Sequence, residues 1–182
     1  MKPNYIGILG AIIALISIAL PWWTLIMSTS VIEISYSLEA ILYLYQSQAK
    51  SMGVSTTFGI DTWYCWAALA LIVIGCIMGI IGSISAAYRK MLLILGGIII
   101  LLAPIIFASG LSYELSRSLV MTGAPQVGLF SSGSVASFEV TFNYSSYLTY
   151  GFWLALVGAI IVIIAAFKKT EKASAEPAAI PT

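Results

Sequence analysis

The side chains that could carry out chemistry are few, and the charged ones lie outside the apolar runs of the chain. The sequence has no histidine, which removes the commonest zinc ligand, the usual haem ligand and the favoured proton shuttle. The carboxylates between the apolar runs show no metal-site spacing: Glu33, Glu39, Asp61, Glu114 and Glu139. We therefore expect no catalytic residue, no metal site and no cofactor, and we interpret these carboxylates as a solvated outer surface.

Two other chemically reactive features are visible. Cys65 and Cys76 lie 11 residues apart in one apolar run. On a helix this spacing separates their α-carbons by about 16 Å, whereas a disulfide bridges about 7 Å, so we expect no bond between them.

Asn143-Tyr144-Ser145 is an acceptor sequence for N-linked glycans. Because it lies close to the last apolar run and inside a predicted strand, we do not expect it to be modified.

The composition indicates which solvent surrounds these residues. The chain is 60% hydrophobic and 8% charged, whereas about a quarter of the residues of a soluble domain are charged. The net charge of +1 is too small to attract nucleic acid. We therefore expect a multi-pass protein of the cell membrane that contacts lipid and has no nucleic-acid partner.

Four apolar runs are long enough to span a bilayer, for which about 20 residues suffice. They lie at 5–27, 63–88, 91–109 and 147–167, and none contains Asp, Glu, Lys or Arg. We predict an all-α membrane fold, a left-handed bundle of four transmembrane helices that forms a single domain over residues 1–169. Its outer loops are residues 28–62 and 110–146, and residues 170–182 are expected to be a disordered cytoplasmic tail.

The basic residues predict the orientation of the chain. Two lie on one side of the predicted bundle, Lys50 and Arg117. Six lie on the other: Lys2, Arg89, Lys90, Lys168, Lys169 and Lys172. Because loops rich in Lys and Arg stay inside, we expect both termini in the cytoplasm. In an alternative, the first run is a signal peptide cleaved near residues 28–30, which leaves three helices in the same orientation.

Alternating apolar residues predict strands in both outer loops. Residues 31–38 and 137–144 alternate with period two, so we expect them to pair in a small antiparallel sheet, with 53–60 as a third strand. Residues 38–50 show helical spacing, 110–119 continue the third helix outward, and 122–134 are expected to be a flexible loop. The predicted outer contact surface comprises Ile32, Ile34, Tyr36, Phe138, Val140 and Phe142.

Small residues recur at heptad-like spacing along three of the runs, and Gly75 and Gly79 form a GxxxG motif. The predicted packing residues are Gly7, Gly10, Ala14, Gly75, Gly79, Gly82, Gly151, Ala155 and Gly158. They can pack within one bundle or form a face for another protein, and both interpretations stay open. The third run has fewer small residues, so we expect that helix at the periphery.

The tryptophans cluster near the outer ends of the predicted helices. Tryptophan prefers the headgroup level of a bilayer, so we predict an outer belt of anchors: Trp22, Trp23, Trp63, Trp66 and Trp153. Pro21 has no N–H and deprives the Ser17 carbonyl of its helical partner. We expect Ser17 itself to help satisfy that carbonyl.

The stretch "ALPWWTLIMSTSVIEISYS" resembles the end of the first helix in the claudins and the related peripheral myelin protein family, which carry Leu-Pro-X-Trp there, matched by Leu20 to Trp23. The resemblance implies four helices, both termini inside, strands in two outer loops and a third helix that extends outward. The claudin signature Trp-Gly-Leu-Trp and its two loop cysteines are absent, so adhesion and pore formation are not carried over. The isoleucine-rich, cysteine-free outer face is more similar to small four-helix membrane proteins of archaea with comparable "PWW" ends.

Together these features predict a non-catalytic interaction or scaffold protein, or an accessory subunit of a membrane complex. Its partners are expected to be other membrane proteins or a second copy of itself. The alternative is a small channel or carrier formed by oligomerisation. Transporters usually place ionisable groups at membrane depth, and the four apolar runs have none.

Overall fold

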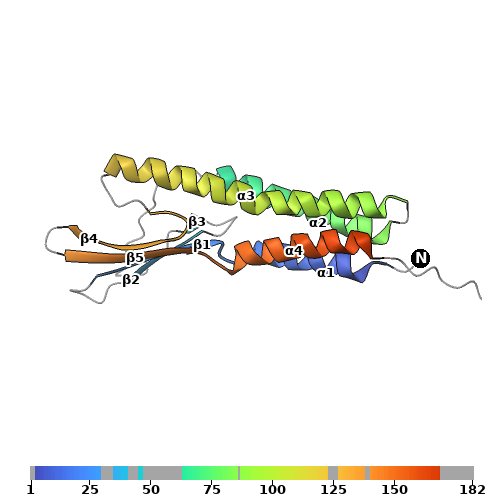
Figure 1. Cartoon of the computed structure of the whole chain (residues 1–182), viewed down its shortest axis with the longest axis horizontal. Coiled ribbons are helices and arrows are strands. Elements are labelled where there is room, and N and C mark those ends of the chain that lie inside the picture. The colour runs from blue at the N-terminus through green and yellow to red at the C-terminus, as the bar shows by residue number, and fades with distance from the viewer. Residues whose placement is uncertain are drawn as a thin grey trace, which may run out of the picture.

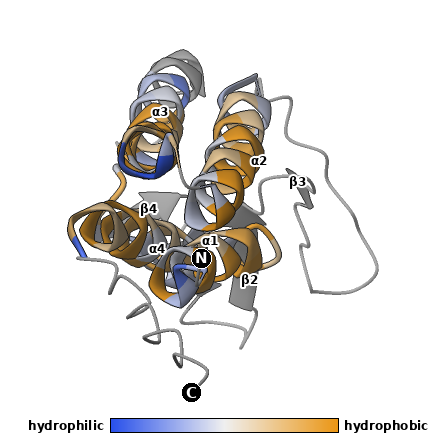
Figure 2. Cartoon of the chain, turned by 90° about the vertical axis from the view of Figure 1, so that its right-hand side faces the viewer, coloured by the Kyte–Doolittle hydropathy of each residue, from blue (hydrophilic) through white to orange (hydrophobic). Residues whose placement is uncertain are grey.

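A computed structural model of the chain describes residues 3–29, 35–40, 45–46, 63–85, 87–122, 127–137 and 140–168. A bundle of helices occupies one end of the molecule and a five-stranded sheet the other (Figure 1). The helices are α1 (Tyr5–Ser17), α2 (Trp63–Ile84), α3 (Arg89–Thr122) and α4 (Tyr150–Phe167). α1 and α3 each pack against both α2 and α4, so the bundle closes around one shared interior (Figure 2).

Three of these helices, α2, α3 and α4, are long and apolar enough to cross a membrane, judged by length and composition. The first helix is shorter, and the prediction of a helix over 5–27 is wrong. α1 has 13 residues and ends at Ser17. The next three backbone N–H groups donate to carbonyls three residues back, in a tighter turn than that of an α-helix. Trp23–Thr29 is a strand, β1. Pro21 has no N–H to continue the helix and disfavours helical geometry at Leu20.

The bounds of α3 and α4 also differ from the predicted ones, at the ends of these helices that lie next to the sheet. α3 continues to Thr122, past the predicted end at Ser109, so helical character over 110–119 is confirmed. This extension passes beyond the bundle to the level of the sheet (Figure 1). α4 begins at Tyr150 because Tyr147 and Leu148 belong to a strand. The expectation that the third helix is peripheral is wrong, since α3 packs against two neighbours.

The sheet is antiparallel throughout, in the order β3-β2-β1-β5-β4. Besides β1, its strands are β2 (Ser35–Ala40), β3 (Tyr45–Gln46), β4 (Ser131–Ser137) and β5 (Val140–Leu148). The two predicted strands are therefore present in part, but they do not pair with each other. β1 lies between β2 and β5, and Met27 pairs with both Tyr36 and Tyr144.

Two loop predictions also need correction. The helix predicted over 38–50 is wrong where the chain is described, because 38–40 belong to β2 and 45–46 form β3. The predicted flexible loop at 122–134 contains the start of β4. Residues 31–34, 53–60 and 170–182 lie outside the described residues, so the third predicted strand and the disordered tail stay predictions.

Candidate functional site

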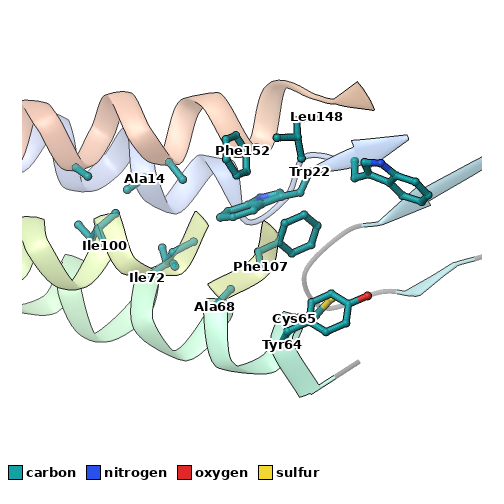
Figure 3. Close-up of a cluster of buried hydrophobic side chains, with 14 of the residues drawn as sticks. Ala14, Trp22, Tyr64, Cys65, Ala68, Ile72, Ile100, Phe107, Leu148 and Phe152 are labelled. Atoms are coloured by element: carbon teal, nitrogen blue, oxygen red, sulfur yellow. The ribbon is translucent and has the colours of Figure 1, made fainter. Parts of the chain in front are cut away.

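Four aromatic side chains meet where the bundle joins the sheet, and we call this cluster the aromatic junction. It comprises Trp22 from the α1–β1 connection, Tyr64 from α2, Phe107 from α3 and Phe152 from α4 (Figure 3). The ring of Trp22 lies edge-to-face against Phe107 and Phe152, with centroid separations of 5.1 and 6.0 Å. Tyr64 contacts Phe107 at 5.8 Å. The aromatic junction thus joins the ends of all four helices that lie next to the sheet, through favourable ring geometry.

Trp22 also closes the end of α1. Its indole Nε1 donates to the Ser17 carbonyl at 2.8 Å, which is the carbonyl left without a helical donor by Pro21. The Leu20 N–H approaches the same carbonyl at 3.3 Å. The Ser17 hydroxyl donates instead to the Ala14 carbonyl at 2.6 Å, so the expectation that Ser17 satisfies this gap itself is wrong.

The segment around Pro21 is held against the start of α4. The Pro21 carbonyl accepts from the Gly151 N–H at 2.9 Å, and the Trp22 carbonyl accepts from the Thr149 N–H at 3.0 Å. The Thr149 hydroxyl donates to the Pro21 carbonyl as well. A β-carbon at Gly151 would lie 2.7 Å from Trp22 Nε1, so only glycine leaves room for the indole here. The sequence identified Gly151 as a packing residue without indicating that it fits a tryptophan.

The five tryptophans divide into two groups. Trp22 and Trp23 are 0% and 1% exposed, so the prediction that they anchor the protein in lipid is wrong for these two side chains. The chain bends at Pro21 and carries them into the interior. Trp63, Trp66 and Trp153 are 57%, 58% and 50% exposed near the same end of the bundle, and their role as anchors stays a prediction.

The small residues bring the helix backbones into close contact. A β-carbon at Gly158 in α4 would lie 2.8 Å from the Gly10 carbonyl in α1, and one at Gly75 in α2 would lie 2.7 Å from the Gly96 carbonyl in α3. All nine predicted packing residues are buried: Gly7, Gly10, Ala14, Gly75, Gly79, Gly82, Gly151, Ala155 and Gly158. These residues therefore pack within the bundle, which leaves them no free face for a second protein.

Sequence reasoning missed part of this packing on α3. A β-carbon at Gly97 would lie 3.1 Å from the Ala159 carbonyl of α4, and one at Gly110 would lie 2.5 Å from Cγ of Tyr64. The signal available in the sequence for this packing was the adjacent pair Gly96-Gly97. Consecutive residues of a helix lie on different faces, and here Gly96 contacts α2 while Gly97 contacts α4.

The predicted outer contact surface is only partly described. Ile32, Ile34 and Phe138 lie outside the described residues. Tyr36 lies in β2 opposite Met27, Val140 lies in β5 opposite Ser137, and Phe142 lies in β5 opposite Thr29. Their register places them within one sheet, and a contact role for them stays a prediction.

The end of the bundle away from the sheet is polar. The Asn4 N–H donates to the Ser83 carbonyl at 2.9 Å, and the Asn4 amide donates to the Ala165 carbonyl at 2.7 Å, so one residue joins three helices. Arg89 donates through Nε to the Ser85 carbonyl at 3.3 Å. The Lys90 Nζ lies 5.3 Å from the centre of the Phe167 ring.

The candidate metal ligands among the described residues are dispersed. Within the described residues, no group of three or more His, Cys, Asp or Glu residues lies together.

Cys65 and Cys76 are free and buried, as expected from their spacing, and the Cys76 thiol donates to the Ala11 carbonyl at 3.3 Å. Glu114 is buried near the end of the apolar segment Arg89–Ser116 of α3. No protein-family model matches this sequence, and no curated protein matches it.

Proposed function

We propose that this chain is a non-catalytic integral membrane protein that acts as an interaction partner, scaffold or accessory subunit of a membrane complex. The observation that carries the proposal is the sorting of side chains by size across the bundle. Helix faces in mutual contact carry glycine and alanine, with single larger side chains such as Ile72 and Ile100 between them. Faces turned outward carry large aliphatic side chains.

This sorting suits a lipid environment. The outward aliphatic side chains include Leu9, Ile12, Ile16, Ile74, Ile77, Ile81, Ile98, Leu102, Ile105, Val157, Ile160 and Ile164. A soluble monomer rarely exposes a continuous apolar surface beyond a few hundred Å². In lipid, by contrast, helices associate through small residues that allow close backbone approach, and their large apolar side chains face the acyl chains.

The two ends of the molecule support the proposed orientation. α1 begins, α4 ends and α2 connects to α3 at the same end, away from the sheet (Figure 1). Arg89, Lys90 and Lys168 lie at that end. Basic residues favour the cytoplasmic side of a membrane, which places both termini inside and the sheet outside under this proposal.

Partner recognition is then assigned to the surfaces that the bundle leaves free. The small-residue faces are occupied within the chain, so the sheet and the α3 extension are the outer candidates for contact. A claudin-like arrangement is part of the proposal. It is supported by a first helix that leads directly into a strand, a sheet built from two outer segments, and a long third helix.

The second candidate function is a small channel or carrier formed by several copies. Ala14, Ile72, Ile100 and Val162 fill the centre of the single bundle, and all are fully buried. A conduit would therefore have to lie between copies, where the described helices present aliphatic side chains. This arrangement favours the interaction role over transport.

Purification from native membranes in a mild detergent, followed by native mass spectrometry, tests the proposal. We expect the chain to resist extraction by alkaline carbonate and to co-purify stoichiometrically with a different membrane protein. A strict monomer would contradict the subunit role. A homo-oligomer that conducts ions after reconstitution into liposomes would favour the channel instead.

A further inference from the structure

We propose that Asn143 carries an N-linked glycan on the polar face of the sheet. Asn143-Tyr144-Ser145 is the one Asn-X-Ser/Thr sequence in the chain, since the other asparagine, Asn4, is followed by Tyr5 and Ile6. The inference rests on the proposed function for one point, the position of the sheet outside the membrane, where such glycans are attached.

The structure removes the objection that a strand hides this asparagine. Asn143 lies in β5, where its backbone pairs with Ser28 of β1 and Ser134 of β4. Strand pairing uses the backbone, and successive side chains point to opposite faces of a sheet. Asn143 is exposed, whereas Ser146, three residues further along β5, is buried on the other face. The Asn143 amide forms no hydrogen bond with any residue that the structure describes.

The residues directly across from Asn143, and those two positions away along its own strand, are short and carry hydroxyl groups. Ser28 and Ser134 lie opposite it on the adjoining strands, and Thr141 and Ser145 lie two residues away along β5. Such neighbours are about 5 Å distant across strands and about 7 Å along a strand. None of these four is large or charged, so they leave Asn143 exposed and offer hydrogen bonds to the first sugar, while Ile26 is a larger, half-buried neighbour on the diagonal.

The position along the molecule also suits an enzyme that works outside the membrane. Asn143 precedes the first residue of α4, Tyr150, by seven residues. At about 3.3 Å per residue, the strand carries it roughly 23 Å beyond the helix. The basic residues Arg89, Lys90 and Lys168 mark the opposite end of the bundle.

The modification is a glycosyl transfer that requires no oxidant or reductant. The donor is an oligosaccharide carried on a polyprenyl phosphate or pyrophosphate, and a host oligosaccharyltransferase catalyses the step. A bond forms between Nδ2 of Asn143 and the anomeric carbon of the first sugar. The bond between that carbon and the carrier oxygen breaks, the carrier phosphate leaves with the electron pair, and Nδ2 loses one proton to an enzyme base.

Peptide mass mapping of the full chain, purified from membranes of its native host, tests this inference. The segment between Arg117 and Lys168 contains one asparagine, so a sugar on it is assigned without ambiguity. We expect a mass increment made of whole sugar residues on this segment. The increment should be lost in Asn143→Gln and in Ser145→Ala, which removes the hydroxyl but keeps the asparagine. It should persist in Ser145→Thr, the matched control.

An unmodified wild-type segment, or an increment that persists in Ser145→Ala, overturns the inference. Carbonate extraction of the same membranes separates this failure from that of the proposed function. A membrane-embedded chain without sugar contradicts the glycan alone. A chain released by carbonate contradicts the proposed membrane role.

Discussion

The indole Nε1 of Trp22 donates to the carbonyl oxygen of Ser17 across 2.8 Å, five residues back along the chain. A helix donor at position 21 would normally serve this carbonyl, but Pro21 has none. The side chain that follows the proline thus replaces the backbone donor that the proline lacks. The same ring packs against Phe107 and Phe152, so one tryptophan ends α1 and fills the aromatic junction.

Trp22→Phe separates these two roles, because it keeps an aromatic ring and removes the donor. We expect a loss of about 1–3 kcal/mol in unfolding free energy, since a buried carbonyl loses its best partner. Denaturation in mixed micelles with increasing SDS measures it. Trp153→Phe is the control, because Trp153 is half exposed and should change little. Equal stability of the Trp22 variant and the wild type would show that the bond is unimportant.

Gly158→Ala should destabilise the pairing of α1 with α4. Its new β-carbon would lie 2.8 Å from both the Gly10 carbonyl and the Ala14 N–H, and backbone cannot move aside as a side chain can. Overpacking of this kind costs about 1–3 kcal/mol, measurable by the same SDS titration.

Gly79→Ala is the matched control for that variant. A β-carbon at Gly79 would lie 3.5 Å from Val162 and 3.7 Å from Ala11, which is ordinary contact. Alanine is also the better helix former, so we expect unchanged or slightly raised stability. Gly79→Leu, in contrast, should disrupt packing. If Gly79→Leu unfolds like the wild type as well, the packing role of Gly79 is refuted.

Gly110→Ala tests the fit of Tyr64 against α3. The added methyl group would lie 2.5 Å from Cγ of Tyr64 and would displace a ring that contacts Phe107 at 5.8 Å. We expect a loss of about 1–3 kcal/mol in unfolding free energy together with a changed near-ultraviolet circular dichroism spectrum. Gly128→Ala should behave like the wild type, because its methyl group would have no neighbour closer than 3.9 Å.

The proposed orientation of the chain predicts opposite labelling of two exposed positions. Ser132 lies on β4 in the sheet, and Ala87 lies in the connection between α2 and α3. In sealed, right-side-out vesicles, Ser132→Cys should react with a membrane-impermeant maleimide, whereas Ala87→Cys should react only after the vesicles are opened. The unsubstituted chain is the control, because Cys65 and Cys76 are buried. The reverse labelling pattern would invert the proposed topology.

Local signals in the sequence were sufficient to predict the long helices and most of the small residues at their contacts. A run of apolar residues without charge allows few alternatives to a helix in lipid, because the backbone must satisfy its own hydrogen bonds there. The periodic small residues are likewise a property of one helix at a time. For this reason the burial of Gly10, Gly75 and Gly158 could be predicted without knowing which helices would meet.

The region after Pro21 could not be predicted in this way. Residues 18–27 are apolar enough for a helix, and only long-range pairing turns Trp23–Thr29 into the central strand, between β2 and β5. β-Propensity depends on cross-strand neighbours, and β5 lies more than 110 residues further along the chain.

The sequence by itself thus determined that the chain forms long apolar helices, and it identified small residues at the contacts of three of them. The tertiary structure alone decided that Trp23–Thr29 becomes the central strand, that Trp22 and Trp23 turn inward, and that Asn143 stays exposed within a strand. The physical reason is that helical hydrogen bonds and helix faces are local, whereas strand pairing and aromatic packing depend on partners distant in the chain.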